Sequence, residues 1–242
     1  MTVEILATPA AVARAAATRI AGLLRRRGRP VLLLPVGKTA VPIYRELARL
    51  HAAGRAPFRR ATTFNLDELR AAPEDPRSFR AFMDRHLFSK VDLDARRIRF
   101  LRGDAPDVGR ECARYDRELA REGPPDLALV GIGENGHVAY LEPARSLPPT
   151  TSLVRLSAST RRGLAADGLQ PAPREALTVG IETIVASKAI LLVAVGRKKA
   201  AAVAAALGGP VTARCPASFL SLHPRLEVFL DREAASRLGR RS

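Results

Sequence analysis

Residues 126–143, which read DLALVGIGENGHVAYLEP, gather several groups that could do chemistry. An apolar run of strand length, residues 127–130, leads into a loop with three glycines. The loop and the residues after it supply an amide, Asn135, an imidazole, His137, and a carboxyl, Glu142. Such a loop could hold a nucleotide, a metal ion or a substrate that undergoes proton transfer.

The glycines of this loop, Gly131-x-Gly133-x-x-Gly136, formally match a dinucleotide-binding fingerprint. That motif also needs a helix that opens directly from the loop, with its N-terminus at the pyrophosphate. Pro143 follows seven residues after Gly136, and two more prolines come soon after it, which leaves little room for a long helix. The sequence therefore argues against dinucleotide binding.

The histidines bear on the other two possibilities. His51, His86 and His223 do not stand at metal-ligand spacing from His137, so the sequence predicts no metal site. A lone histidine in a loop is often only a hydrogen-bonded surface group. Because Glu142 is close in sequence, however, it could orient the ring of His137 and raise its basicity, which is the usual arrangement for a histidine that transfers protons.

A second glycine turn, Gly37-Lys38-Thr39, follows the apolar run 31–36. It resembles the end of a nucleotide-binding P-loop, but that motif needs a glycine where this chain has Leu32. A glycine turn before a helix N-terminus, with Thr39 as its cap, can still hold a single phosphate through backbone amides and the helix dipole. A plain turn between a strand and a helix is the alternative.

Two pairs of charged residues also follow predicted strands. Asp67 and Glu68 end an apolar run, and adjacent strand residues point in opposite directions, so one carboxyl should face a pocket and the other solvent or a helix. The first would be a candidate base, although a helix cap or a salt bridge is the commoner role. Lys198 and Lys199 could neutralise a phosphate or lie in solvent.

The elements that position these residues alternate between strands and helices. Apolar runs of strand length with helical patterns between them predict an α/β fold, a Rossmann-like open and mostly parallel sheet of about seven strands with helices on both faces. In such sheets ligands bind beyond the carboxyl ends of the strands, so the loops after Val36, Leu66, Val130 and Val195 should converge on one pocket. We expect one domain, 1–242, with strands at 31–36, 62–66, 98–101, 127–130, 153–156, 176–181, 189–195 and 226–230, and helices at 8–28, 39–50, 78–90, 107–121, 182–186 and 197–207.

The composition of the chain limits its possible partners. The 242 residues carry a net charge of +16, but the arginines are spread through every region without interleaved aromatics, so we expect no nucleic-acid binding. No stretch approaches the roughly 20 apolar residues that span a membrane, so we expect no membrane partner. We expect no signal peptide, and the only two cysteines, Cys112 and Cys215, suit a cytoplasmic location.

Seven segments of the chain, in order, resemble the glucosamine-6-phosphate deaminase family, which is related to the 6-phosphogluconolactonases. They cover most of residues 31–231. A single segment would be weak evidence, but seven in the same order are a strong resemblance. The segments are PVGKTAVPIY, TFNLDEL, SFRAFMDRHLFSKVDL, GIGENGHVAYLEP, EALTVGIETI, VGRKKA and SLHPRLEVFLD.

The resemblance implies an enzyme that isomerises an aldose phosphate to a ketose phosphate with loss of ammonia and needs no cofactor. Asp67 would move a proton between C2 and C1 of the opened sugar. His137 would protonate the ring oxygen, with Asn135 and Glu142 as its partners. The phosphate would rest on the turn Gly37-Lys38-Thr39, with Lys199 as its counter-charge. Gly133 and Gly136 would also contact the substrate.

The chain departs from the family pattern in three places. It has Leu69-Arg70-Ala71 after the two acids and Leu141 before Glu142, where the family commonly has Tyr-Val-Gly and an asparagine. An arginine that grips the phosphate in the family is replaced by Ala166. Loss of such a contact would weaken binding by roughly 1.5 to 3 kcal/mol. Arg161 or Arg162 could take its place, and the identity of the sugar phosphate stays open.

Three alternatives remain at this stage. The protein could hydrolyse a lactone, as the related lactonases do, in which case Asp67 and Glu142 would matter little. It could bind a sugar phosphate without turnover, as the missing arginine would allow. Binding of nucleic acid rests on charge alone. The chain stops soon after its last strand, so we expect a monomer or a small homo-oligomer without allosteric control.

Overall fold

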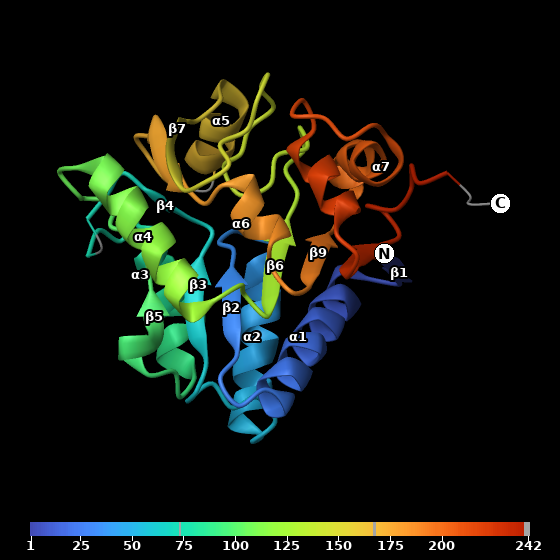
Figure 1. Cartoon of the computed structure of the whole chain (residues 1–242). Helices are drawn as coiled ribbons and strands as arrows, with labels where there is room; N and C mark the ends of the chain where they lie inside the picture. The colour runs from blue at the N-terminus through green and yellow to red at the C-terminus, as the bar shows by residue number, and fades with distance from the viewer. Residues whose placement is uncertain (73, 167, 240–242) are drawn as a thin grey trace.

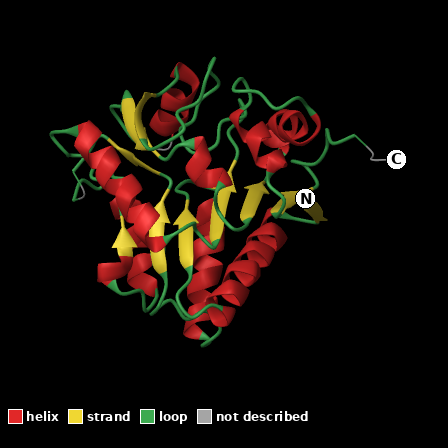
Figure 2. Ribbon diagram, in the orientation of Figure 1, coloured by secondary structure: helices red, strands yellow, loops and turns green. Residues whose placement is uncertain are grey.

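The computed structural model describes residues 1–72, 74–166 and 168–239, and its centre is a seven-stranded sheet (Figures 1 and 2). Every pair of neighbouring strands in this sheet is parallel. The order is β1-β10-β9-β6-β2-β3-β5. The bounds are β1 Thr2–Leu6, β2 Val31–Leu34, β3 Thr62–Asn65, β5 Ile98–Arg99, β6 Leu127–Gly131, β9 Ile190–Ala194 and β10 Leu226–Asp231.

The order of the strands reverses between β2 and β6. From β2 the chain adds β3 and β5 on one side, and it then returns to place β6 against the other side of β2. Because its strand pairs are parallel, the strands of this sheet end at one edge, as the arrows of its central strands show (Figure 2). Ligands of open α/β sheets bind where the strand order reverses, so the loops after β2 and β6 are the expected place for a site.

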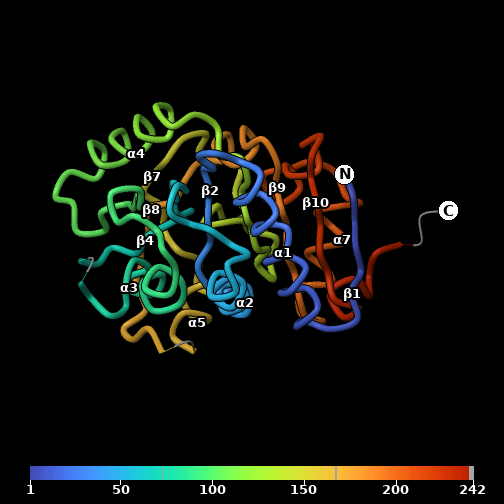
Figure 3. Tube along the Cα trace, turned by 90° about the horizontal axis from the view of Figure 1, so that it is seen from below, coloured from blue at the N-terminus to red at the C-terminus, as the bar shows by residue number. Residues whose placement is uncertain are grey.

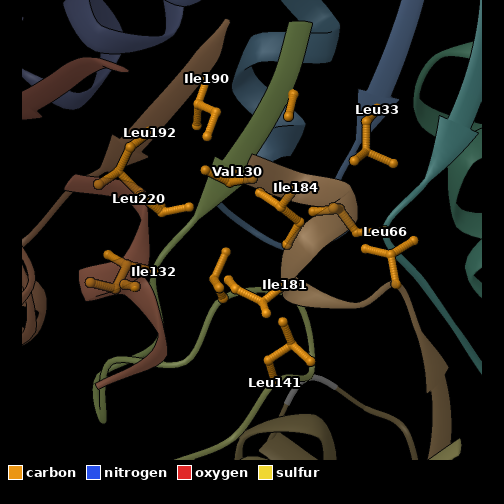
Figure 4. Packing of buried hydrophobic residues seen from close by; sticks show 14 of the residues in the cluster. Leu33, Leu66, Val130, Ile132, Leu141, Ile181, Ile184, Ile190, Leu192 and Leu220 are labelled. Atoms are coloured by element: carbon orange, nitrogen blue, oxygen red, sulfur yellow. The ribbon is translucent and has the colours of Figure 1, made fainter. Parts of the chain in front are cut away.

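Alternate strand residues face the two sides of the sheet, and helices cover both (Figure 3). Leu32, Leu34, Leu127 and Leu129 pack with helices α1 Pro9–Arg26, α2 Ala40–Ala52 and α3 Phe79–His86. The intervening residues pack with α4 Val108–Glu122, α6 Ile181–Val185 and α7 Ala200–Gly208. Figure 4 shows part of this second layer, in which Ile184 of α6 lies against Val130. The predicted fold class is confirmed.

A second sheet, which the sequence analysis did not predict, lies beyond the carboxyl ends of the first. It has the antiparallel order β4-β8-β7, and its strands are β4 Asp67–Leu69, β7 Ser152–Arg155 and β8 Glu175–Thr178. The expected strands at 153–156 and 176–181 therefore exist but do not belong to the parallel sheet. Asp67 does not end β3; it begins β4 and pairs with Thr178.

Other differences from the predicted elements are local. β1 and the helix α5 Ala158–Ala166 were not predicted. The helix expected at 78–90 ends at His86, and short 3-10 turns precede or follow several elements. These turns are η1 Phe88–Lys90, η2 Ala95–Arg97, η3 Arg197–Lys199 and η4 Pro216–Leu222. Within the described ranges, no helix combines the length and the apolar character needed to cross a membrane.

Candidate active site

The turn after β2 adopts the shape expected of a phosphate-binding turn. Gly37 has a φ of +118°, which is a conformation that favours glycine, and its carbonyl accepts a hydrogen bond from the amide of Ala40 at 3.0 Å. Thr39 occupies the N-cap of α2, but its side chain caps no amide among the described residues. The predicted role of Thr39 as a side-chain cap is therefore wrong, and its hydroxyl is not used by the helix.

A cavity of about 380 Å³ lies beside this turn. It joins three of the four loops that we expected to meet, those after β2, β6 and β9, and it lies against α1. Its polar lining includes Lys38, Thr39, Glu134, Lys198 and Lys199. Asp67 and His137 do not line the cavity.

Lys199 has an environment suited to an anion. It lies in η3, directly after the Gly196 turn that follows β9. Burial lowers the pKa of Lys199, the charge of Glu134 opposes that change, and the charge of Lys198 adds to it. A bound phosphate would restore the stability of the charged ammonium, because an opposite charge favours it.

The glycines of the loop after β6 allow close packing around His137. A β-carbon on Gly133 would overlap the imidazole ring, and the Gly133 amide donates to the His137 carbonyl at 2.8 Å. Gly136 has a φ of +87°, and a β-carbon there would lie 2.9 Å from the sulfur of Cys215. The loop therefore needs glycine at both positions in order to pack around the histidine and Cys215. The sequence analysis expected these two glycines to contact the substrate, and that role stays a prediction.

Asn135, His137 and Glu142 lie together, as predicted. The Asn135 amide donates to a carboxylate oxygen of Glu142 at 2.8 Å, and its own oxygen accepts from the backbone amide of His137 at 3.2 Å. The His137 Nδ1 atom lies 3.7 Å from the same Glu142 oxygen. This separation suits an ion pair and is longer than a hydrogen bond. Nδ1 is buried and has no hydrogen-bond partner among the described residues.

Glu142 is held from its other side by the start of α5. Its second oxygen accepts hydrogen bonds from the hydroxyls of Thr160 and, at 3.1 Å, Ser157. Burial favours the neutral acid, but the contacts with His137, Thr160 and Asn135 outweigh burial and lower the pKa of Glu142 to about 2. Glu142 is therefore a carboxylate at neutral pH. The sequence analysis missed Ser157 and Thr160, although hydroxyls three residues apart at a helix start are a capping pattern that could have drawn attention to them.

Asp67 is the most unusual carboxyl in the site. It is 5% exposed, and its Oδ1 atom is buried without a hydrogen-bond partner among the described residues. Burial raises the pKa of Asp67 to about 8, and the neighbouring Glu68 adds to the rise. Its charge also contributes to the raised pKa values of Tyr44 and Tyr115. Because the Tyr44 hydroxyl donates to the carbonyl of Pro35, Asp67 lies near the turn after β2.

Glu68 has a structural role. Its carboxylate accepts hydrogen bonds from the backbone amides of Phe79 at 2.7 Å and Arg80 at 2.9 Å, at the start of α3. The two adjacent acids therefore point in different directions, as the strand geometry predicts. Glu68 holds the start of α3, whereas the buried Oδ1 atom of Asp67 has no hydrogen-bond partner in the part of the chain that the structure describes.

Comparison with known proteins places this geometry in a family. The sequence pattern of the glucosamine-6-phosphate isomerases/6-phosphogluconolactonase family matches residues 6–228. The chain belongs to this family. A relative from Giardia intestinalis, glucosamine-6-phosphate deaminase 1, is 42% identical over 90% of this chain and 84% of its own length. The glucosamine-6-phosphate deaminase of Cellvibrio japonicus is 40% identical over 99% of this chain and 92% of its own.

Solved structures of the family extend the comparison. One that is described as a monomeric glucosamine-6-phosphate deaminase has a TM-score of 0.95, with 37% identity over 98% of this chain and 100% of its own. The 6-phosphogluconolactonase of Thermotoga maritima has a TM-score of 0.76 with 21% identity, over 95% of this chain and 98% of its own, which shows a shared fold. These relatives at 37 to 42% identity are glucosamine-6-phosphate deaminases, and the chain is an enzyme.

Two departures from the family pattern can now be placed. Ala166 is the last residue of α5 and is exposed. Arg162 is exposed as well, whereas Arg161 is partly buried. Leu141 is buried in the core below the loop, where it packs in the cluster that contains Ile181 (Figure 4).

Within the described residues, no three His, Cys, Asp or Glu side chains gather in a way that could hold a metal ion.

Proposed function

We propose that the protein converts glucosamine 6-phosphate and water to fructose 6-phosphate and ammonia. The observation that carries this proposal is that two carboxyls of the site have pKa values shifted in opposite directions. Glu142 is a carboxylate held next to His137, whereas Asp67 is buried, unpaired and raised in pKa to about 8. Carboxyls whose pKa values are pushed apart by their surroundings are typical of an acid–base site.

Ring opening is assigned to His137. Its imidazole takes the proton from the C1 hydroxyl and gives a proton to the ring oxygen as the bond between C1 and that oxygen breaks. A carboxylate beside the ring stabilises the imidazolium formed in between. Glu142 supplies this charge, and Asn135 and the hydroxyls of Ser157 and Thr160 hold Glu142 in place.

Isomerisation is assigned to Asp67. As a carboxylate it removes the proton from C2 of the open chain, while the C1 carbonyl oxygen takes a proton that the C2 amino group gives up. Asp67 then returns its proton to C1, which leaves a hydroxymethyl group at C1 and an imine at C2. Water adds to this imine, the carbon–nitrogen bond breaks, and ammonia leaves with the ketose phosphate as the other product. A raised pKa matches the base to a weakly acidic carbon and to neutral or slightly alkaline solution.

The phosphate is assigned to the turn after β2 and to the cavity beside it. The backbone amides of Gly37–Thr39 and the N-terminus of α2 suit an anion, and Lys38 and Lys199 line the same cavity. We assign Gly133 and Gly136 to contact with the sugar through their backbone atoms, because their β-carbon positions are filled by His137 and Cys215. We assign the reaction to the cytoplasm, where the free thiols of Cys112 and Cys215 suit a reducing medium.

Ammonia release tests the proposal directly. We expect the purified protein to free ammonia from glucosamine 6-phosphate, with kcat/KM rising with pH through about 8 as Asp67 ionises. Asp67→Asn should lower kcat by about 100- to 10,000-fold, which is the usual contribution of a general base. A protein that frees no ammonia from this sugar or from its galactosamine isomer is not the proposed deaminase.

The lactonase alternative has less support. The lactonases among the solved structures are 18 to 21% identical to this chain, whereas the deaminase structure is 37% identical. Assay of a 6-phospholactone separates the two activities. A lactonase rate that exceeds ammonia release and is unchanged in Asp67→Asn would select the lactonase function.

A further inference from the structure

A second cavity lies at the edge of the central sheet opposite to the candidate active site. Its volume is about 560 Å³, and the residues that line it come from the segments before β3 and β5, at the amino ends of these strands. In Figure 1 these ends lie at the bottom of the sheet, and α5 lies beyond its opposite end. Every described residue of the lining is charged, and we call this cavity the arginine groove. Its lining is Arg59, Arg60, Asp92, Asp94, Arg96 and Arg97.

The pairing of β3 with β5 brings the arginines together. Thr63 lies opposite Ile98 in this parallel pair, so the residues that precede the two strands are also neighbours. Adjacent strands are separated by only about 4.8 Å. Two arginine pairs, Arg59-Arg60 and Arg96-Arg97, therefore meet at one edge of the sheet, where their like charges repel one another.

The turns that carry the two arginine pairs are held in place by the fold. The amide of Ala61 donates to the carbonyl of Phe58 at 2.8 Å, which closes a tight turn with the first pair at its corners. Phe58 is fully buried, and its amide donates to the carboxylate of Asp92 at 2.8 Å. The second pair lies in η2, which the side chain of Asp94 caps at 2.9 Å. Binding of a ligand at these turns would therefore cost little backbone entropy.

The acids of the groove neutralise only part of its charge. Asp94 forms an ion pair with Arg96 at 2.9 Å. Hydrogen bonds from Arg96, followed by the charges of Arg96 and Arg97, hold the pKa of Asp94 below its ordinary value. The two arginines of the first turn have no hydrogen bond or ion pair among the described residues. Four arginines and two aspartates leave the lining with a net charge of +2, which an anion would offset.

The lining also indicates the chemistry of that anion. A guanidinium binds phosphate oxygens through parallel hydrogen bonds. A volume of about 560 Å³ lies in the range of sites for whole small molecules, so a chain of phosphates fills it better than one phosphate. The described lining has no aromatic or apolar side chain that would hold a base or a sugar. We propose that the arginine groove binds a linear polyphosphate anion through its phosphate chain. This site goes beyond the proposed function, because it lies apart from the catalytic loops.

Calorimetry with sodium tripolyphosphate tests the proposal on the whole protein. Arg60→Gln combined with Arg97→Gln removes one guanidinium from each turn and should weaken binding by at least about 10-fold, the scale of one charge-assisted hydrogen bond. The matched control combines Arg110→Gln with Arg117→Gln, two exposed arginines of α4, and should bind as the wild type does. An equal loss of affinity in the two double variants would assign binding to the total charge and overturn the proposal.

The cavity beside the turn after β2 also contains cations, so the position of the ligand needs its own control. Lys199 lines that cavity and lies outside the arginine groove. Lys199→Gln should retain the tripolyphosphate binding that the groove double variant loses. If Lys199→Gln loses this binding instead, the ligand occupies the other cavity and the proposal is wrong.

Three further ligands test the chemistry of recognition. Adenosine triphosphate without magnesium should bind no more tightly than tripolyphosphate, because the groove offers the base no apolar contact. Orthophosphate should bind at least about 10-fold more weakly than tripolyphosphate, since it meets fewer of the arginines. Tighter binding of the nucleotide, or of a single-stranded DNA oligonucleotide, would mean that the groove recognises more than a phosphate chain and would overturn the proposal.

Repulsion among the arginines gives a second readout that needs no ligand. At low salt the melting temperature of the groove double variant should exceed that of the wild type by more than that of the control variant does, and about 500 mM potassium chloride should remove the difference. Tripolyphosphate should raise the melting temperature of the wild type and hardly change that of the groove variant. Arg59→Gln alone should show the same effects at a smaller size. A groove variant that melts below the wild type would show that the arginines stabilise the unliganded fold, contrary to the proposal.

Discussion

At the scale of residues, the two adjacent acids on β4 differ in role: Glu68 stabilises the fold, and Asp67 is the proposed base. Backbone amides of α3 offset the burial of Glu68, whereas no described residue donates a hydrogen bond to the buried Oδ1 atom of Asp67. Burial of a carboxyl without a partner favours the neutral form, so Asp67 should make the folded state less stable as the pH rises. The residue that we assign to the base is also a weak point of the fold.

This effect on stability can be measured with Asp67→Asn. The pKa of Asp67 is about 8 in the folded protein against its ordinary value of 3.8, so between these pH values the folded state holds a proton that the unfolded state has lost. The free energy of unfolding of the wild type therefore falls as the pH rises through this window, whereas neutral asparagine has no such loss. At pH 7 the variant should be more stable by up to about 4 kcal/mol, and at pH 4 the gain should nearly vanish.

Denaturant unfolding at several pH values checks this prediction. The exposed acid Asp104 offers a control, because Asp104→Asn should show no comparable growth of stability with pH. A gain for Asp67→Asn that is the same at pH 4 and pH 7 would mean that the carboxyl does not titrate as described.

At the scale of elements, the loop after β6 places His137 by close packing. Because a β-carbon on Gly133 would overlap the imidazole, Gly133→Ala should push the ring away from Glu142. Small displacements of a catalytic group can cost about 100-fold in rate, so we expect a loss of this order in kcat. Steady-state kinetics on the folded variant measure it.

Gly131 is the matched control for this substitution. It lies in the same sequence motif, but a β-carbon there meets no atom within 4 Å. Gly131→Ala should keep nearly the full rate. Equal rates for the two alanine variants would show that the packing at Gly133 does not position the histidine.

The elements also show what could be predicted from the sequence. The long helices and the buried strands were predicted to within a few residues, because their apolar periodicity is local: α4, for example, was expected at 107–121 and spans Val108–Glu122. β1 was missed because it is an edge strand whose residues are mostly exposed, so it carries no apolar run. α5 was missed because it lies in a proline-rich stretch without buried residues.

The candidate site was predicted in parts, for a related reason. The association of Asn135, His137 and Glu142 follows from short spacing in the sequence, and it was found. The place of Asp67 on β4 depends on its pairing with Thr178, a contact between distant segments that leaves no local pattern. The resemblance to the family identified Asp67 as the candidate base. Only the structure shows that its Oδ1 atom is buried without a hydrogen-bond partner among the described residues.

At the scale of the whole molecule, the net charge of +16 should act on an anionic substrate. Positive potential raises the encounter rate with anions, and salt screens it. We expect kcat/KM for glucosamine 6-phosphate to fall as potassium chloride is raised from about 10 to about 500 mM, with little change in kcat. Initial rates over this range test the effect.

Two charge variants show where the effect originates. Lys198 lines the cavity, so Lys198→Gln should make the salt dependence shallower. Arg96 lies in η2, before the amino end of β5 and thus at the opposite edge of the sheet, and Arg96→Gln should change the slope little. Identical slopes in both variants would attribute the salt effect to the total charge alone.

The single domain stays a prediction. The expected monomer or small homo-oligomer also stays a prediction, which sedimentation can test.

The small antiparallel sheet has a consequence for the order in which the protein folds and becomes active. β4 belongs to the first third of the chain and β8 to the last third, and their pairing is what seats Asp67. Contacts between distant segments form only after a large loss of chain entropy, so they tend to come late in folding. A chain that has built its parallel sheet but not yet docked β8 would already present the turn that holds phosphate and would still lack its base. Such a chain would hold the sugar and leave it unchanged, so the appearance of turnover marks the completion of the molecule.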